Sequence, residues 1–213
     1  QTNRIVRDPV VTAPVEALVT HLCAAAELER CPVAAYVVRS DEVNAYALPG
    51  RRLIVTTAML REVHDESELA GVLGHELAHV ERRHSMQVLA REIGLTLLLT
   101  AGGGQSTVLR DAAKALTTSA YDRSLESEAD FDAVEHLAAG RIASLPFAEL
   151  MYRLAESEGD FASSLTWLSS HPDPYQRAKA ITEASAAHRY TPVAVLDPAA
   201  WRELQDALRT TED

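Results

Sequence analysis

The sequence has 213 residues, of which 47% are hydrophobic and 24% are charged, enough apolar residues to fill one core. Twenty Lys and Arg against 31 Asp and Glu give a net charge of −11, which argues against electrostatic binding to nucleic acid or to an anionic membrane. The longest apolar run, residues 93–101, has about half the length that a transmembrane helix needs. We therefore expect a folded domain without a transmembrane segment, and peripheral membrane association stays open.

The N-terminal quarter predicts one helix and a small sheet. Residues 1–12 are expected to form a tail or an added strand, and residues 14–28 a helix with Pro14 in its first turn. Three short runs typical of strands follow, over residues 33–38, 44–48 and 53–56. Turn residues separate these runs, so they predict an antiparallel or mixed sheet.

The remainder of the chain predicts helices only. The longest begins at Ser67 and is expected to continue, with or without a kink, through Val88 and Leu97 to a glycine-rich break at residues 102–104. Further helices are predicted over residues 107–118, 122–139, 147–158, 174–187 and 198–208. The predicted class is α+β, with a small N-terminal sheet packed against a mostly helical remainder.

Two cysteines, Cys23 and Cys31, lie eight positions apart. They are either two free thiols or a local disulfide that ties a helix end to the following loop. A disulfide would indicate an oxidising compartment. Their spacing excludes a metal site of the CxxC type.

One five-residue motif, His75-Glu76-Leu77-Ala78-His79, lies inside a strongly helical segment. Residues i and i+4 of a helix share a face, so the two imidazoles can point at one ion. Neutral imidazole is a favoured ligand of Zn²⁺. Glu76 projects beside the two histidines, where it can accept a proton from water that the metal activates. The alternative is a pair of surface histidines, which the apolar residues around the motif disfavour.

A second pair of acidic residues supplies a candidate third ligand. Catalytic zinc sites usually have three protein ligands, one more than the two histidines provide. Glu126 and Asp130 lie four positions apart on a predicted helix and share a face, whereas Glu128 points elsewhere. Glu126 is the candidate ligand, and Asp130 is the candidate acceptor for the second N–H of a ligand histidine. A solvated acidic helix face is the alternative.

HExxH followed by ExxxD on a later helix is similar to the gluzincin arrangement, and the chain resembles the M48 metallopeptidases. Four segments carry this resemblance, and together they span about residues 33–185. The segments are residues 44–57, 68–84, 121–130 and 171–177. The resemblance implies a single zincin-like metallopeptidase domain over residues 13–213, preceded by the tail or added strand over residues 1–12.

The resemblance also implies a zinc-dependent endopeptidase that acts on polypeptides. It further implies a role in protein quality control. One Zn²⁺ per chain would be held by His75, His79 and Glu126, with Glu76 as general base and acid and Asp130 supporting His75. The alternative function is a zinc-bearing binding module, similar to a chaperone, with little or no cleavage. The sequence does not indicate an oligomeric state.

Further site residues follow from the same resemblance. The run Asn44, Ala45, Tyr46 and Ala47 is expected to be an edge strand that binds an extended substrate, with an ordinary hairpin strand as the alternative. Family members commonly have a second glycine after Gly50, where this chain has Arg51-Arg52. That added basic bulk either alters the choice of substrate or faces water.

His171 and Arg177 complete the set of candidate residues. His171 is expected either to donate a hydrogen bond to the oxyanion of the reaction or to cap the zinc in a self-inhibited state. Arg177 is expected to anchor this segment through an ion pair. Residues 102–106 or the His171 loop are expected to cover the cleft. The resemblance, together with a first residue that is not Met, predicts an extracytoplasmic bacterial location, periplasmic or secreted.

Overall fold

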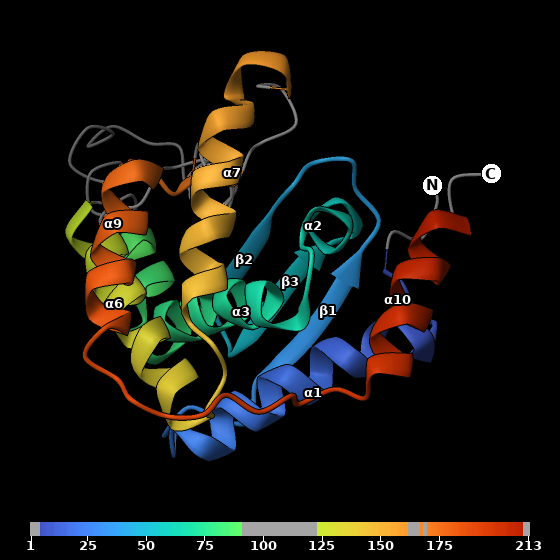
Figure 1. Cartoon of the computed structure of the whole chain (residues 1–213), viewed down its shortest axis with the longest axis horizontal. Helices are drawn as coiled ribbons and strands as arrows, with labels where there is room; N and C mark the ends of the chain where they lie inside the picture. The colour runs from blue at the N-terminus through green and yellow to red at the C-terminus, as the bar shows by residue number, and fades with distance from the viewer. Residues whose placement is uncertain (1–4, 91–122, 162–166, 168–169, 211–213) are drawn as a thin grey trace, which may run out of the picture.

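The computed structural model describes residues 5–90, 123–161, 167 and 170–210 (Figure 1). Most of the described chain is helical, with one small sheet, so the predicted α+β class is confirmed. The helix predicted over residues 107–118 and the glycine-rich break lie outside the described residues. The elements are α1 Pro9–Ala25, β1 Ala34–Val38, β2 Ala45–Leu48, β3 Arg52–Thr56, α2 Thr57–Glu62, α3 Glu66–Glu81, α6 Arg123–Ala139, α7 Leu145–Phe161, α9 Pro174–Ser185 and α10 Pro198–Thr210.

The sheet is mixed and has the strand order β1-β3-β2. β1 pairs with β3 in parallel, whereas β2 pairs with β3 antiparallel, with Tyr46 opposite Ile54. β2 is therefore an edge strand, as predicted for the run that begins at Asn44. On the other side of the sheet, Ile5 forms an isolated antiparallel bridge with Val38.

The first helix begins earlier than the sequence predicted. α1 starts at Pro9, so residues 9–12, expected in a tail or an added strand, are helical, and Pro14 lies inside the helix. The side chain of Asp8 caps the helix by accepting a hydrogen bond from the backbone of Val10 at 3.0 Å. An Asp followed by Pro is a strong signal for the start of a helix. The expectation that Pro14 lies in the first turn is therefore wrong, because Asp8 and Pro9 begin the helix five residues earlier.

α3 is the central element of the fold (Figure 1). It contacts α6 and α7 as well as strands β2 and β3, and α1 also packs against it. Every residue from Glu68 to Val80 is buried, which leaves the helix no solvated face. At Gly71 the backbone approaches α7 so closely that a Cβ would lie 2.4 Å from Cβ of Phe147, which only glycine permits.

The helix predicted from Ser67 through Val88 is interrupted. α3 ends at Glu81, and Arg83 adopts a positive φ of 56°, which breaks the helical path. Residues 84–90 are helical again in a new direction, and the predicted extension to Leu97 lies outside the described residues. The break carries His84 back towards α3, where it becomes part of the site.

Three further observations complete the fold. Cys23 at the end of α1 and Cys31 in the following loop are joined by a disulfide, so the free-thiol alternative is not adopted. The short helix α2, which the sequence did not predict, begins with Thr56 as its cap. Within the described ranges, no helix combines the length and the apolar character that crossing a membrane requires.

Candidate active site

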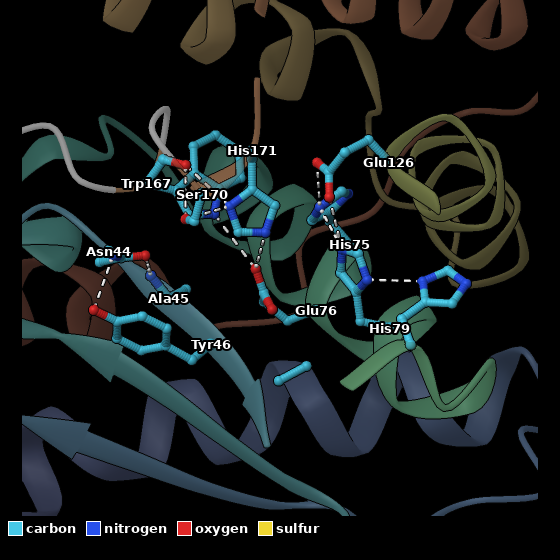
Figure 2. Close-up of polar contacts among 12 residues, drawn as sticks. Asn44, Ala45, Tyr46, His75, Glu76, His79, Glu126, Trp167, Ser170 and His171 are labelled. Atoms are coloured by element: carbon cyan, nitrogen blue, oxygen red, sulfur yellow. Dashed lines mark hydrogen bonds and ion pairs between the residues drawn. The ribbon is translucent and has the colours of Figure 1, made fainter. Parts of the chain in front are cut away.

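The two histidines of the HExxH motif lie on one buried face of α3 (Figure 2). Both side chains are fully buried, and their Nε2 atoms are 3.0 Å apart. Their rings meet edge to face with centroids 4.6 Å apart. The i, i+4 spacing therefore produces the convergence that the sequence predicted for His75 and His79.

α6 brings Glu126 to the same point from the other side. Its carboxylate lies 3.5 Å from Nε2 of His75 and 3.4 Å from Nε2 of His79. Close packing of α6 against α3 buries Glu126 to 1% exposure, although the two motifs are about fifty residues apart in the sequence. Glu128, two residues later, is half exposed and does not join the cluster; its carboxylate lies against Arg82 and 3.7 Å from Nε2 of His84.

The chemistry of these groups fits a divalent cation of the zinc type. One ligand atom from each of His75, His79, Glu126 and His171 lies within 4.8 Å of the others. Glu126 forms an ion pair with Arg177 at 2.7 Å, yet neither of its buried oxygens accepts a well-aligned hydrogen bond from the described residues. Buried carboxylate oxygens without hydrogen-bond donors are costly unless a cation compensates them. Two imidazoles and one carboxylate are also a usual ligand set of catalytic zinc.

The protonation states suit metal binding at three of the four groups. Burial acts to raise the pKa of Glu126, but the nearby His171 and Arg177 outweigh it and hold that pKa well below its usual range. Burial lowers the pKa values of His79 and His171, which favours their neutral, metal-binding forms. At His75, burial acts to lower the pKa, but the neighbouring carboxylates of Asp130 and Glu126 outweigh it and raise the pKa to about 9, so that a cation would have to displace a proton there.

Asp130 and Arg177 support the histidine side of the cluster. The Asp130 carboxylate lies 3.0 Å from Nδ1 of His75, the position predicted for a partner that fixes the ring. Arg177, from α9, donates two hydrogen bonds of 2.7 Å to Asp130 and a third of 3.1 Å to the carbonyl of His171. Arg177 thus ties α9, α6 and the His171 segment together, and is more than the anchor of one segment.

His84 plays the corresponding part at the second histidine. Its Nδ1 lies 2.8 Å from Nδ1 of His79, and the ring is buried. The sequence alone does not place His84 in the site, because nothing in its spacing shows that the chain turns back after α3. A histidine five residues after HExxH is the signal that was available.

The Glu76 carboxylate lies beside the cluster without joining it (Figure 2). It is fully buried, and its Oε1 accepts a hydrogen bond of 3.4 Å from the indole of Trp167 and lies 3.5 Å from Nε2 of His171. His171 is oriented through Nδ1, which lies 3.0 Å from the carbonyl of Trp167 and 2.9 Å from Oγ of Ser170. Trp167 is therefore a direct contact of Glu76 as well as a fully buried aromatic residue.

Comparison with known proteins decides the family. The sequence profile of peptidase family M48 matches residues 9–185 of the chain. The chain belongs to peptidase family M48.

Curated relatives in this family are distant and longer. The chain is 27% identical over 189 residues to the beta-barrel assembly-enhancing protease of Yersinia pestis, covering 81% of this chain and 38% of that protein. It is 28% identical over 208 residues to the putative beta-barrel assembly-enhancing protease of Vibrio cholerae, covering 91% and 42%. With the mitochondrial metalloendopeptidase OMA1 of Schizosaccharomyces pombe it shares 29% identity over 155 residues, covering 70% and 45%. The chain thus spans about two-fifths of the length of these relatives.

The M48 assignment agrees with a metal-dependent peptidase site. The edge strand β2 lies next to this site. β2 packs against α3 and begins beside Glu76 and His171 (Figure 2). Part of its backbone is already hydrogen-bonded, because Ala45 donates to Oδ1 of Asn44 at 2.8 Å and the Ala47 carbonyl accepts from Ser85 at 2.6 Å. Just before β2, the carbonyl of Val43 accepts a hydrogen bond from the backbone of Trp167 at 3.0 Å.

Proposed function

We propose that this chain is the catalytic domain of a zinc-dependent endopeptidase, in which His75, His79 and Glu126 hold one Zn²⁺. The observation that carries the proposal is the convergence of these three buried side chains from α3 and α6, in a chain of family M48. Zn²⁺ held there would polarise the scissile carbonyl and acidify a water molecule.

The surrounding residues supply proton transfer and orientation. Glu76 acts as the general base, since its carboxylate lies next to the histidine pair but contributes no ligand atom. Asp130 and His84 hold the rings of His75 and His79 through their second nitrogens. Every one of these side chains is buried, which limits the access of bulk solvent, and a low-dielectric site strengthens the electrostatic interactions within it.

The substrate chain is proposed to bind along β2 as an added strand. Asn44, Ala45, Tyr46 and Ala47 lie at the edge of the sheet next to Glu76, and Tyr46 is half buried with its hydroxyl accepting from the Asn44 amide at 2.9 Å. Backbone hydrogen bonds to such an edge recruit extended peptides largely without regard to their sequence. An unfolded or loosely folded polypeptide is therefore the proposed substrate class.

An extracytoplasmic location and a part in protein quality control belong to the same proposal. The Cys23–Cys31 disulfide favours an oxidising compartment, because such bonds are rare where thiols are kept reduced. Two bacterial relatives carry the names beta-barrel assembly-enhancing protease and putative beta-barrel assembly-enhancing protease, and by analogy with these names we propose a part in protein quality control.

Metal analysis of the purified chain tests the proposal directly. We expect about one zinc per chain, loss of cleavage of an unstructured protein after chelation, and recovery on adding back Zn²⁺ but not Mg²⁺, because imidazole ligands prefer zinc. Mass spectrometry under native conditions gives the number of zinc ions per chain. The increase in fluorescence on cleavage of dye-labelled casein gives the activity. A chain that binds no zinc, or that cleaves equally well after chelation, would refute the assignment.

Replacing His171 with alanine distinguishes two roles for this residue. If His171 caps the site, the variant should cleave peptides severalfold faster, because its imidazole would no longer lie among the ligand atoms of His75, His79 and Glu126. If His171 instead donates to the oxyanion, cleavage should fall by about 10²–10³-fold with zinc retained. Initial rates on a short fluorogenic peptide, measured with matched zinc content, separate the two outcomes. An unchanged rate would remove His171 from the catalytic machinery.

A further inference from the structure

A basic pocket lies beyond the far end of β2. It has a volume of about 310 Å³, and its lining includes Leu48, His79, Arg30, Arg51 and Arg83. Leu48 is the last residue of β2, and His79 belongs to the proposed metal centre. A chain that follows the β2 edge past the metal therefore continues into this pocket, which we call the arginine pocket.

The charge of the arginine pocket is opposite to that of the whole protein. Glu29 lines the pocket and Glu81 lies beside it, where its carboxylate accepts a hydrogen bond of 3.1 Å from the backbone of Arg30, while Arg52 adds a fourth guanidinium that folds back towards Gly50. Four positive and two negative charges leave a local balance of +2, within a chain of net charge −11. A cluster of unlike sign on an acidic protein is a local recognition feature, and not a property of the overall composition.

The guanidinium groups of the pocket are available to a ligand. Arg51 and Arg83 are exposed and form no ion pair with a carboxylate in the part of the chain described by the structure. Arg30 uses its Nε to donate to the backbone carbonyl of Glu81 at 3.0 Å, which fixes its position at the edge of the pocket. By contrast, Arg82 pairs with Asp132 and Glu128 on α6 and takes no part in the pocket.

The backbone supplies a second, independent observation. Arg51 and Arg83 both adopt left-handed conformations, with φ of 60° and 56°. Glycine would occupy such positions without the cost that a side chain carries there, and left-handed non-glycine residues are enriched at functional sites. Two arginines therefore line one pocket from two loops, each at a backbone position that suits glycine, which favours a binding role over general surface charge.

We propose that the arginine pocket is a specificity site that binds an acidic side chain of the substrate polypeptide, on the side of the scissile bond towards Leu48. This inference rests on the proposed protease function. A carboxylate entering the pocket would meet two or three guanidinium groups, which bind carboxylates through paired hydrogen bonds. The pocket therefore adds side-chain selection to the sequence-independent binding of the backbone along β2.

Matched peptides test the proposal. Fluorogenic peptides that differ only by Glu or Gln at successive positions around the cleavage site are compared, and we expect the wild type to favour Glu at one position by about tenfold in kcat/KM. The double variant R51G/R83G should bring this ratio to within twofold of one. Because glycine relieves the left-handed backbone, its thermal stability should not fall. R51E/R83E should invert the ratio, and should favour Lys over Glu at the same position.

Two controls separate this inference from the function on which it rests. R202E places the same change of charge on exposed α10, far from the pocket, and should keep the wild-type ratio. Binding of the same peptides to the Glu76→Gln variant, followed by fluorescence anisotropy, needs no cleavage and should show the same preference. Absence of cleavage with the binding preference intact would refute the protease function alone. Equal binding and cleavage of the Glu and Gln peptides at every position would overturn the pocket assignment.

Discussion

Replacing Glu76 with glutamine is expected to reduce peptide-bond hydrolysis by about 10²–10⁴-fold while leaving bound zinc at one per chain. Glutamine keeps the size of the side chain and can still pair with the indole of Trp167, which donates to Glu76 Oε1. It cannot accept a proton from water, so the chemical step fails although the cluster of His75, His79 and Glu126 is untouched. Steady-state kinetics on a fluorogenic peptide and zinc analysis of the same preparation provide the two measurements.

Glu135→Gln is the matched control for this variant. It makes the same chemical change on α6, but the Glu135 side chain is 46% exposed and its ion pair is with His188 at the surface, 3.0 Å away. Its activity should stay within about twofold of the wild type, because surface ion pairs contribute little. Two results would contradict the role of Glu76: a variant that still cleaves at the wild-type rate, or one that has lost both activity and zinc.

The parts of the site that the sequence could predict are those governed by helical spacing. His75 and His79 are four positions apart, as are Glu126 and Asp130, and a helix places such pairs on one face whatever surrounds it. The contact between the two pairs belongs to the tertiary structure, and spacing within a helix does not predict it. It was expected from the resemblance to M48 peptidases, and it depends on the close packing of α6 on α3.

The parts that the sequence missed depend on where the chain turns. His84 reaches His79 because Arg83 takes a left-handed conformation. An arginine in a sequence does not predict such a conformation. Trp167 contacts Glu76 through its indole, and its own backbone N–H donates a hydrogen bond to the carbonyl of Val43. An aromatic residue of this kind is most often part of a core, and its indole N–H shows a second use only when its partner is known.

The support for the metal cluster has an energetic consequence that centres on Arg177. Its guanidinium is buried, donates two hydrogen bonds of 2.7 Å to Asp130, and forms an ion pair of 2.7 Å with Glu126. After burial, which acts to raise it, the largest influence on the pKa of Asp130 is this guanidinium, which holds that pKa below its usual range. Arg177 is thus the main counter-charge for two buried carboxylates.

Replacing Arg177 with methionine is therefore expected to destabilise the metal-free protein by about 3–5 kcal/mol, because it leaves buried carboxylates without their cation. For a chain of this size, that loss lowers the Tm by roughly 6–20 °C. Zinc should restore part of the loss, since a divalent cation at Glu126 replaces some of the missing positive charge. Arg177→Lys should fall between the two, because one ammonium cannot form the paired contacts of a guanidinium. Thermal unfolding followed by circular dichroism, with chelator and with zinc, measures each value.

Lys179→Met on the same helix provides the control for loss of a charge from α9. The Lys179 side chain is 72% exposed, and its 3.8 Å contact with Glu183 lies at the surface. Its removal should change the stability by less than about 0.5 kcal/mol, because solvent screens exposed pairs. If Arg177→Met unfolded at the same temperature as Lys179→Met, the carboxylates of Glu126 and Asp130 would not depend on Arg177. The larger loss, partly reversed by zinc, would instead tie the stability of the fold to the charge balance of its metal site.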